Sequence, residues 1–98
     1  MLEEDFITDM VCLAEAQNAL SAIIKDPHKA ASWIKSIFKA NGTVIEIDKN
    51  ILIVSFRYLD HLIVWDAIHY AAALLNNCSE IVSYDKDFDG LEIKRIEP

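Results

Sequence analysis

The chain has few basic residues, few glycines and no long apolar run, and each shortage excludes a class of function. Nine Lys and Arg residues stand against 16 Asp and Glu residues, which gives the 98-residue chain a net charge of −7. This balance disfavours binding to nucleic acid, because phosphate neutralisation requires Lys and Arg. A nucleic-acid role would therefore need metal ions or a local basic patch. Two glycines cannot supply a glycine-rich phosphate loop.

Apolar length and cysteine usage indicate where the protein works. No apolar run reaches the roughly 18 to 20 residues that span a bilayer. The acidic start MLEEDF is wrong for a secretory signal, which begins with positive charge. Cys12 and Cys78 lie in apolar surroundings without CxxC spacing, which suits buried free thiols in a reducing compartment. We therefore expect a cytoplasmic protein with no membrane segment.

What the chain does have is an alternation of strand and helix patterns. Hydrophobic residues make up 53% of the sequence, and its length suits one domain, residues 1–98. Thr8 or Asp9, then Asp26 and Asp48, are placed as helix N-caps. A further helix is predicted to start at Pro27 and to be stopped by Gly42, in the usual C-terminal glycine position. The other patterns predict strands at 5–8, 43–47, 79–85 and 91–96, and helices at 9–25, 49–60 and 62–77.

This alternation is typical of the α/β class. It predicts a parallel sheet of about four strands with helices on its faces. Trp33 and Trp65 are interpreted as core residues, whereas His28 and His61 are expected on the surface. His69 is interpreted as a histidine within or beside the core.

Three acids stand out against this architecture. The carboxyl ends of parallel strands gather at one edge of a sheet, where ligands bind. Asp85 ends the strand at 79–85, and Glu15 lies in the first two turns of the helix after the first strand. Asp66 interrupts an apolar segment, where a buried carboxylate is costly unless it is paired or bound to a cation. Capping of a helix is the alternative role for Asp66, and the two roles are compatible.

Asp87 and Asp89 follow Asp85 within the run SYDKDFDG. Asp87 is a candidate helper at a metal site. Asp89 precedes Gly90, and this pair favours a turn, so we interpret Asp89 as a turn residue.

The segment WDAIHYAAALLNNCSEIVSYDKDFDGLEIKRI resembles the C-terminal half of a PIN domain, the nuclease fold of many bacterial and archaeal toxin components. The shared features are an Asp-Ala start on an alanine-rich helix, a strand that ends in Asp-x-Asp-Phe, and a short final strand. FITDMVCLAEAQNAL resembles the second strand of the family and the helix that carries its glutamate, here Glu15. The resemblance covers nearly the whole chain and implies a PIN-like three-layer sandwich.

The resemblance also implies a set of catalytic acids. Glu15, Asp66 and Asp85 match three of the four family acids, and Asp87 matches a common accessory. These residues are expected to bind Mg²⁺ or Mn²⁺, because clustered carboxylates need a compensating cation and oxygen ligands suit these ions. The implied substrate is RNA.

The first family acid has no counterpart, because the chain starts after the opening strand that carries it. Asp5 and Asp9 are the upstream candidates, and both are interpreted as surface or capping residues. We therefore expect an N-terminally truncated PIN-like domain. In the family the missing strand lies between the strands that correspond to 5–8 and 79–85. Those strands must either pair directly or leave open edges that recruit other chains, so we expect a homo-oligomer or a rearranged sheet.

Three functions remain open at this point. The first is a PIN-type metal-dependent ribonuclease, including a toxin of a toxin–antitoxin pair, with the missing acid supplied from elsewhere. The second is an inactive PIN-like remnant that acts as a binding or assembly module and retains a surface for an antitoxin-like protein. The third is a small α/β protein that only resembles half of a PIN domain.

Overall fold

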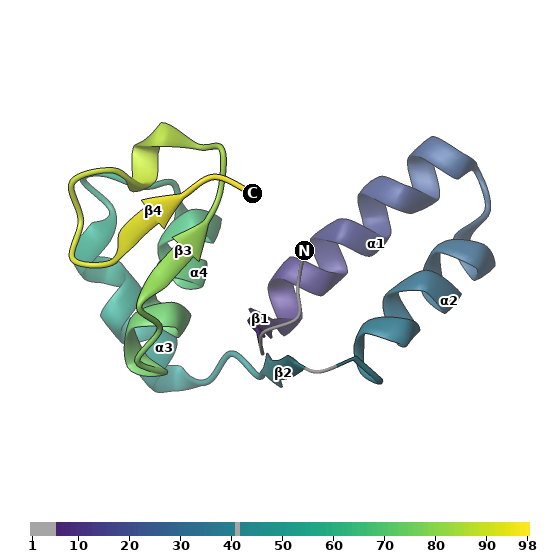
Figure 1. Cartoon of the computed structure of the whole chain (residues 1–98), viewed down its shortest axis with the longest axis horizontal. Coiled ribbons are helices and arrows are strands. Elements are labelled where there is room, and N and C mark those ends of the chain that lie inside the picture. Colours follow the sequence, from purple (N-terminus) through teal and green to yellow (C-terminus); the bar gives the residue numbers. More distant parts are fainter. Residues whose placement is uncertain (1–5, 41) are drawn as a thin grey trace. The chain divides into compact units, whose positions relative to one another are not determined.

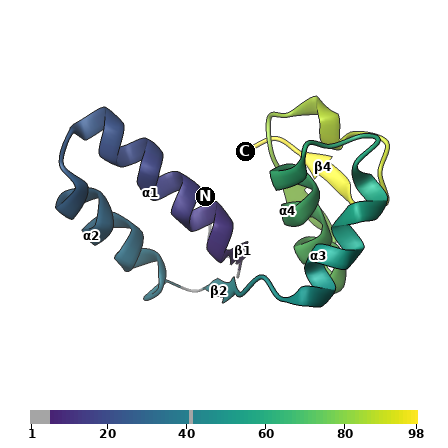
Figure 2. The same cartoon turned by 180° about the vertical axis from the view of Figure 1, so that it is seen from behind.

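The computed structural model describes residues 6–40 and 42–98, so Asp5 lies outside the described residues. The chain divides into two compact units, an N-terminal unit that ends at Glu46 and a C-terminal unit that runs from Ile47 to Pro98. Each unit contains helices and one pair of parallel strands (Figures 1 and 2). The α/β class predicted from the sequence is therefore confirmed.

The N-terminal unit is a strand pair joined to two packed helices. Asp9 caps the first helix with its Oδ1 atom, which accepts a hydrogen bond of 2.8 Å from the Cys12 amide. Asp26 caps the second helix in the same way through the Lys29 amide, and Pro27 occupies its first turn. Both caps match the sequence prediction. The elements are β1 (Phe6–Asp9), α1 (Met10–Ile24), α2 (Pro27–Ile37) and β2 (Gly42–Ile45).

The end of α2 differs from the prediction. The helix ends at Ile37, and Phe38 closes it in a right-handed conformation with its amide bonded to the Lys35 and Ser36 carbonyls. The amides of Lys39 and Ala40 donate to carbonyls three residues earlier, so a tightened last turn replaces a left-handed glycine cap. The prediction that Gly42 stops this helix was wrong, since Gly42 is the first residue of β2.

The C-terminal unit surrounds an aromatic core. Tyr70 is fully buried, and its ring lies 4.7 Å from that of Tyr58 and 6.5 Å from that of Phe88, measured between centroids. The Tyr70 hydroxyl accepts a hydrogen bond of 2.9 Å from the Ile93 amide. The elements are α3 (Lys49–Ser55), the 3₁₀ turn η1 (Phe56–Tyr58), α4 (Val64–Leu75), β3 (Glu80–Val82), the 3₁₀ turn η2 (Lys86–Phe88) and β4 (Lys94–Ile96).

The four strands are parallel, as predicted, but they are divided between two sheets. β1 pairs with β2 from Phe6 opposite Gly42, and β3 pairs with β4 from Glu80 opposite Lys94. Each unit contributes one strand pair, and the joining of the four strands into one sheet stays a prediction. All four strands are short, with three or four residues each.

Two predicted core positions are exposed. Trp33 on α2 is 44% exposed and Trp65 on α4 is 52% exposed, so both assignments to the core were wrong. Small residues occupy the packed faces of these helices instead, because Ala30 and Ala67 are completely buried. His28 and His61 are exposed, as expected, and His69 is half-buried.

The thiols also differ from expectation. Cys12 is exposed and Cys78 is half-buried, and both are free, so the burial predicted for Cys12 was wrong. The α1 residue that packs into the unit is its neighbour Leu13. None of the described helices is long and apolar enough to cross a membrane.

Candidate functional site

The acids after β3 lie on an exposed 3₁₀ turn. β3 ends at Val82, three residues before Asp85, so the strand is shorter than predicted. The backbone amide of Asp85 donates to the Ser83 hydroxyl (2.9 Å). Oδ1 of Asp85 accepts from the Asp87 amide (2.9 Å), which makes Asp85 the N-cap of η2. Asp85 and Asp87 are both exposed. The local backbone therefore fixes two neighbouring carboxylates on one turn.

Asp89 has a different role. Its Oδ1 atom accepts a hydrogen bond of 2.7 Å from Nε of Arg95, which holds the pKa of Asp89 below its ordinary value. Gly90 follows with a φ of +78°, a conformation that favours glycine. The interpretation of Asp89 as a turn residue is confirmed, and the ion pair explains why a third carboxylate is tolerated here.

Asp66 lies in the first turn of α4 and is half-buried. The N-cap of this helix is Ile63, which offers no side-chain hydrogen bond, so Asp66 is not the capping residue. A carboxylate in a first turn is nevertheless stabilised by the positive end of the helix dipole. This placement accounts for part of the cost of a charge within an apolar helix.

The remaining acids belong to the N-terminal unit. Glu15 is exposed on α1, in the second turn after the N-cap Asp9. Asp9 itself is 5% exposed and accepts from the Cys12 amide. Its interpretation as a capping residue is confirmed, whereas its alternative as a surface residue is excluded.

Within residues 6–40 and 42–98, no group of three or more His, Cys, Asp or Glu side chains is arranged so that it could hold a metal ion. Asp85 and Asp87 come together on η2, and Asp66 belongs to the same unit. Glu15 belongs to the other unit, so its convergence with these acids stays a prediction.

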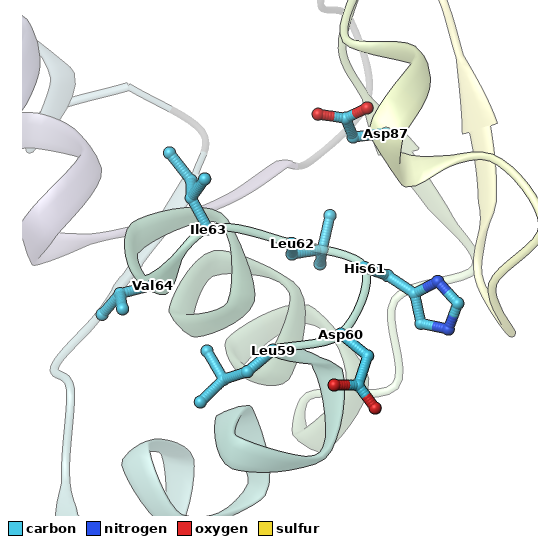
Figure 3. Close-up of a pocket in the computed structure, with 7 residues that line it drawn as sticks. All are labelled: Leu59, Asp60, His61, Leu62, Ile63, Val64 and Asp87. Carbon is cyan, nitrogen blue, oxygen red and sulfur yellow. The ribbon is translucent and has the colours of Figure 1, made fainter.

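An open hollow of about 570 Å³ lies beside Asp87, where the chain leads from η1 into α4 (Figure 3). Two carboxylates and one imidazole reach it, among apolar neighbours. Asp60 was not singled out from the sequence, because an Asp-His pair before an apolar run is typical of a surface turn. The lining residues are Leu59, Asp60, His61, Leu62, Ile63, Val64 and Asp87.

A comparison with protein-family models adds the decisive observation: the model of the PIN domain matches residues 1–94. The chain belongs to the PIN domain family. The match spans both units and includes Glu15, Asp66, Asp85 and Asp87. No curated protein and no solved structure matches the chain significantly.

PIN membership places the chain in a nuclease-type family whose members generally use divalent metal ions. The resemblance seen in the sequence is therefore confirmed at the level of family and fold class. The roles of individual acids, the identity of the ion and the substrate remain predictions.

Proposed function

We propose that the chain is a PIN-type ribonuclease, with Glu15, Asp66 and Asp85 as its catalytic acids and Asp87 as an accessory. The observation that carries this proposal is the family match over residues 1–94, which includes both segments that bear these acids. Mg²⁺ or Mn²⁺ is the proposed ion, because hard cations prefer carboxylate oxygens. The proposal includes a toxin that acts with an antitoxin-like partner in the cytoplasm.

The C-terminal unit supports the proposal in part. Asp85 and Asp87 are exposed on one turn, where a phosphodiester or an ion can approach them. Asp66 lies in the first turn of α4, an apolar helix of the same unit. We propose that another chain supplies the acid that completes the set.

The test compares Asp66→Asn with the wild type in two assays. Mn²⁺ should raise the melting temperature of the wild type, because a ligand that binds the folded state stabilises it. Asp66→Asn should blunt this shift and abolish cleavage of a labelled RNA that depends on Mn²⁺. Asp89→Asn is the matched control, since Asp89 is bonded to Arg95 and should not contribute to either response.

Identical Mn²⁺ responses of the wild type and Asp66→Asn would overturn the ribonuclease proposal. So would an absence of RNA cleavage by a folded wild-type protein with either ion. Both results would favour the second candidate function below.

The second candidate is a PIN-like binding or assembly module without activity. The observation that favours it is a run of exposed apolar side chains at the start of α4, where Ile63 is 66%, Val64 54% and Trp65 52% exposed. Such side chains are costly to leave in water and are typical of interaction surfaces. An antitoxin-like protein or a second copy of the chain is the proposed partner.

A further inference from the structure

The exposed face of α2 is basic, although the chain as a whole is acidic. The segment from Lys25 to Lys39 contains four lysines and a single acid, Asp26. All four lysines are exposed, and the Asp26 carboxylate accepts a hydrogen bond of 3.0 Å from the Lys29 amide as the helix cap. A protein of net charge −7 therefore carries a local basic patch. We call this patch the α2 basic face: His28, Lys29, Trp33 and Lys35 lie on α2, and Lys25 and Lys39 flank the helix.

An exposed aromatic ring lies within the α2 basic face. Trp33 is 44% exposed, and Nζ of Lys29 lies 5.5 Å from the centroid of its ring. The residues that α2 buries are Ala30 and Ile34, whereas nearly half of the Trp33 surface stays exposed. A cation beside an exposed ring orients the indole and concentrates positive charge at its face.

The helix geometry places these groups together. At 100° per residue, His28, Lys29, Trp33 and Lys35 fall within an arc of about 160° on α2, whose middle lies opposite the buried Ala30 and Ile34. Every residue in that arc is exposed, and α2 itself contains no Asp or Glu. The surface combines lysines with a stacking platform.

We propose that the α2 basic face binds single-stranded RNA, with the lysines on phosphates and Trp33 stacked on a base. This inference rests on the proposed function, because it supplies the surface that an acidic ribonuclease needs to hold a polyanion. Lysines neutralise phosphates, and stacking on an aromatic ring is how proteins take up unpaired bases. An acidic peptide would satisfy the lysines but would leave the indole face unused. The combination therefore favours RNA.

The first arm of the test measures binding without cleavage. Fluorescence anisotropy of a labelled single-stranded RNA is recorded in EDTA over a series of salt concentrations. The double variant Lys29→Glu/Lys35→Glu should abolish binding, and Lys29→Ala should lower the slope of log K against log salt by about 0.7. Lys49→Glu/Lys94→Glu is the control, because it changes the net charge equally with two exposed lysines of the C-terminal unit. It should bind far better than the α2 variant.

The second arm follows the indole. In a Trp65→Phe background Trp33 is the remaining tryptophan of the chain, since the sequence contains two. RNA should quench its fluorescence, whereas an oligoglutamate peptide should not. Trp33→Leu should weaken RNA binding roughly tenfold, the loss of one stacked base.

Equal RNA binding by the α2 variant and the control would overturn the inference. Binding of oligoglutamate in place of RNA would also overturn it, and would assign the face to an acidic protein. RNA binding through α2 without any cleavage would leave the inference standing and defeat the ribonuclease proposal. Cleavage that depends on Asp66 but not on α2 would do the reverse.

Discussion

Arg95 is the side chain that organises the loop beside the candidate acids. Its side chain is 12% exposed, and its guanidinium donates to Asp89 at 2.7 Å, to the Ser83 carbonyl at 3.0 Å and to Glu97 at 2.9 Å. These bonds tie β4 to both ends of the loop that carries Asp85. A planar guanidinium can hold several acceptors at once, which a lysine cannot do with the same geometry.

The ion pair between Asp89 and Arg95 predicts a pH dependence. The hydrogen bond from Arg95 lowers the pKa of Asp89 below its ordinary value of 3.8. A lowered pKa stabilises the folded state at neutral pH, and this stabilisation is lost as the pH falls through the lowered pKa. Asp89→Asn should therefore reduce the free energy of unfolding at pH 7 and have less effect in strong acid, as measured by urea unfolding.

High salt should shrink the difference at pH 7, because Asp89 is exposed and its attraction to Arg95 is screened. An equal effect of Asp89→Asn at both pH values would show that the carboxylate acts through something other than its charge.

Tyr70 connects two elements of the C-terminal unit. It lies on α4, and its buried hydroxyl accepts the hydrogen bond from the amide of Ile93, just before β4. Tyr70→Phe leaves a buried amide without an acceptor, which should cost about 1–3 kcal/mol of unfolding free energy. Chemical unfolding measures this, with Tyr84→Phe as the control because Tyr84 is 70% exposed. A cost below that of the control would mean that α4 and β4 are held by packing alone.

The elements themselves were largely predictable from local chemistry. Asp9, Asp26 and Asp48 each cap a helix through a backbone amide three residues on, as the sequence indicated. Such signals act within one turn of chain, so they survive any change in tertiary context. The 3₁₀ turn η1, which ends the helical run begun by α3, and the late start of α4 at Val64 were missed, because helix ends depend on what packs against them.

Burial was less predictable than helix formation. Trp33 fits the apolar spacing of α2, yet Ala30 and Ile34 occupy the packed side. Spacing reports which residues share a face but not which part of that face a neighbouring helix covers. The candidate site shows the same limit. That Asp85 and Asp87 lie close together could be predicted from their sequence spacing, whereas the position of Asp60 and Asp87 around one hollow is evident only from the structure.

One family model matches residues 1–94, yet the chain divides into two units, each with its own parallel strand pair. The pairing β1 with β2 and β3 with β4 leaves each strand with one neighbour among the described residues. Two-stranded sheets are marginal in water unless further strands or helices cover them. Strand edges without a neighbouring strand also need partners for their backbone groups.

These edges predict self-association. Val82 at the end of β3 is 57% exposed, and an open edge with an apolar side chain pairs readily with another chain. We expect a dimer or larger species by light scattering, in equilibrium with the monomer as concentration falls. Val82→Lys should shift that equilibrium toward the monomer, because two chains cannot pair through β3 without bringing the added charges together. Ile23→Lys on α1 is the matched control, since Ile23 is 75% exposed and belongs to no strand. A wild type that stays monomeric over a wide concentration range and unfolds cooperatively would contradict this prediction. It would show that the two-stranded sheets are stable without a second chain.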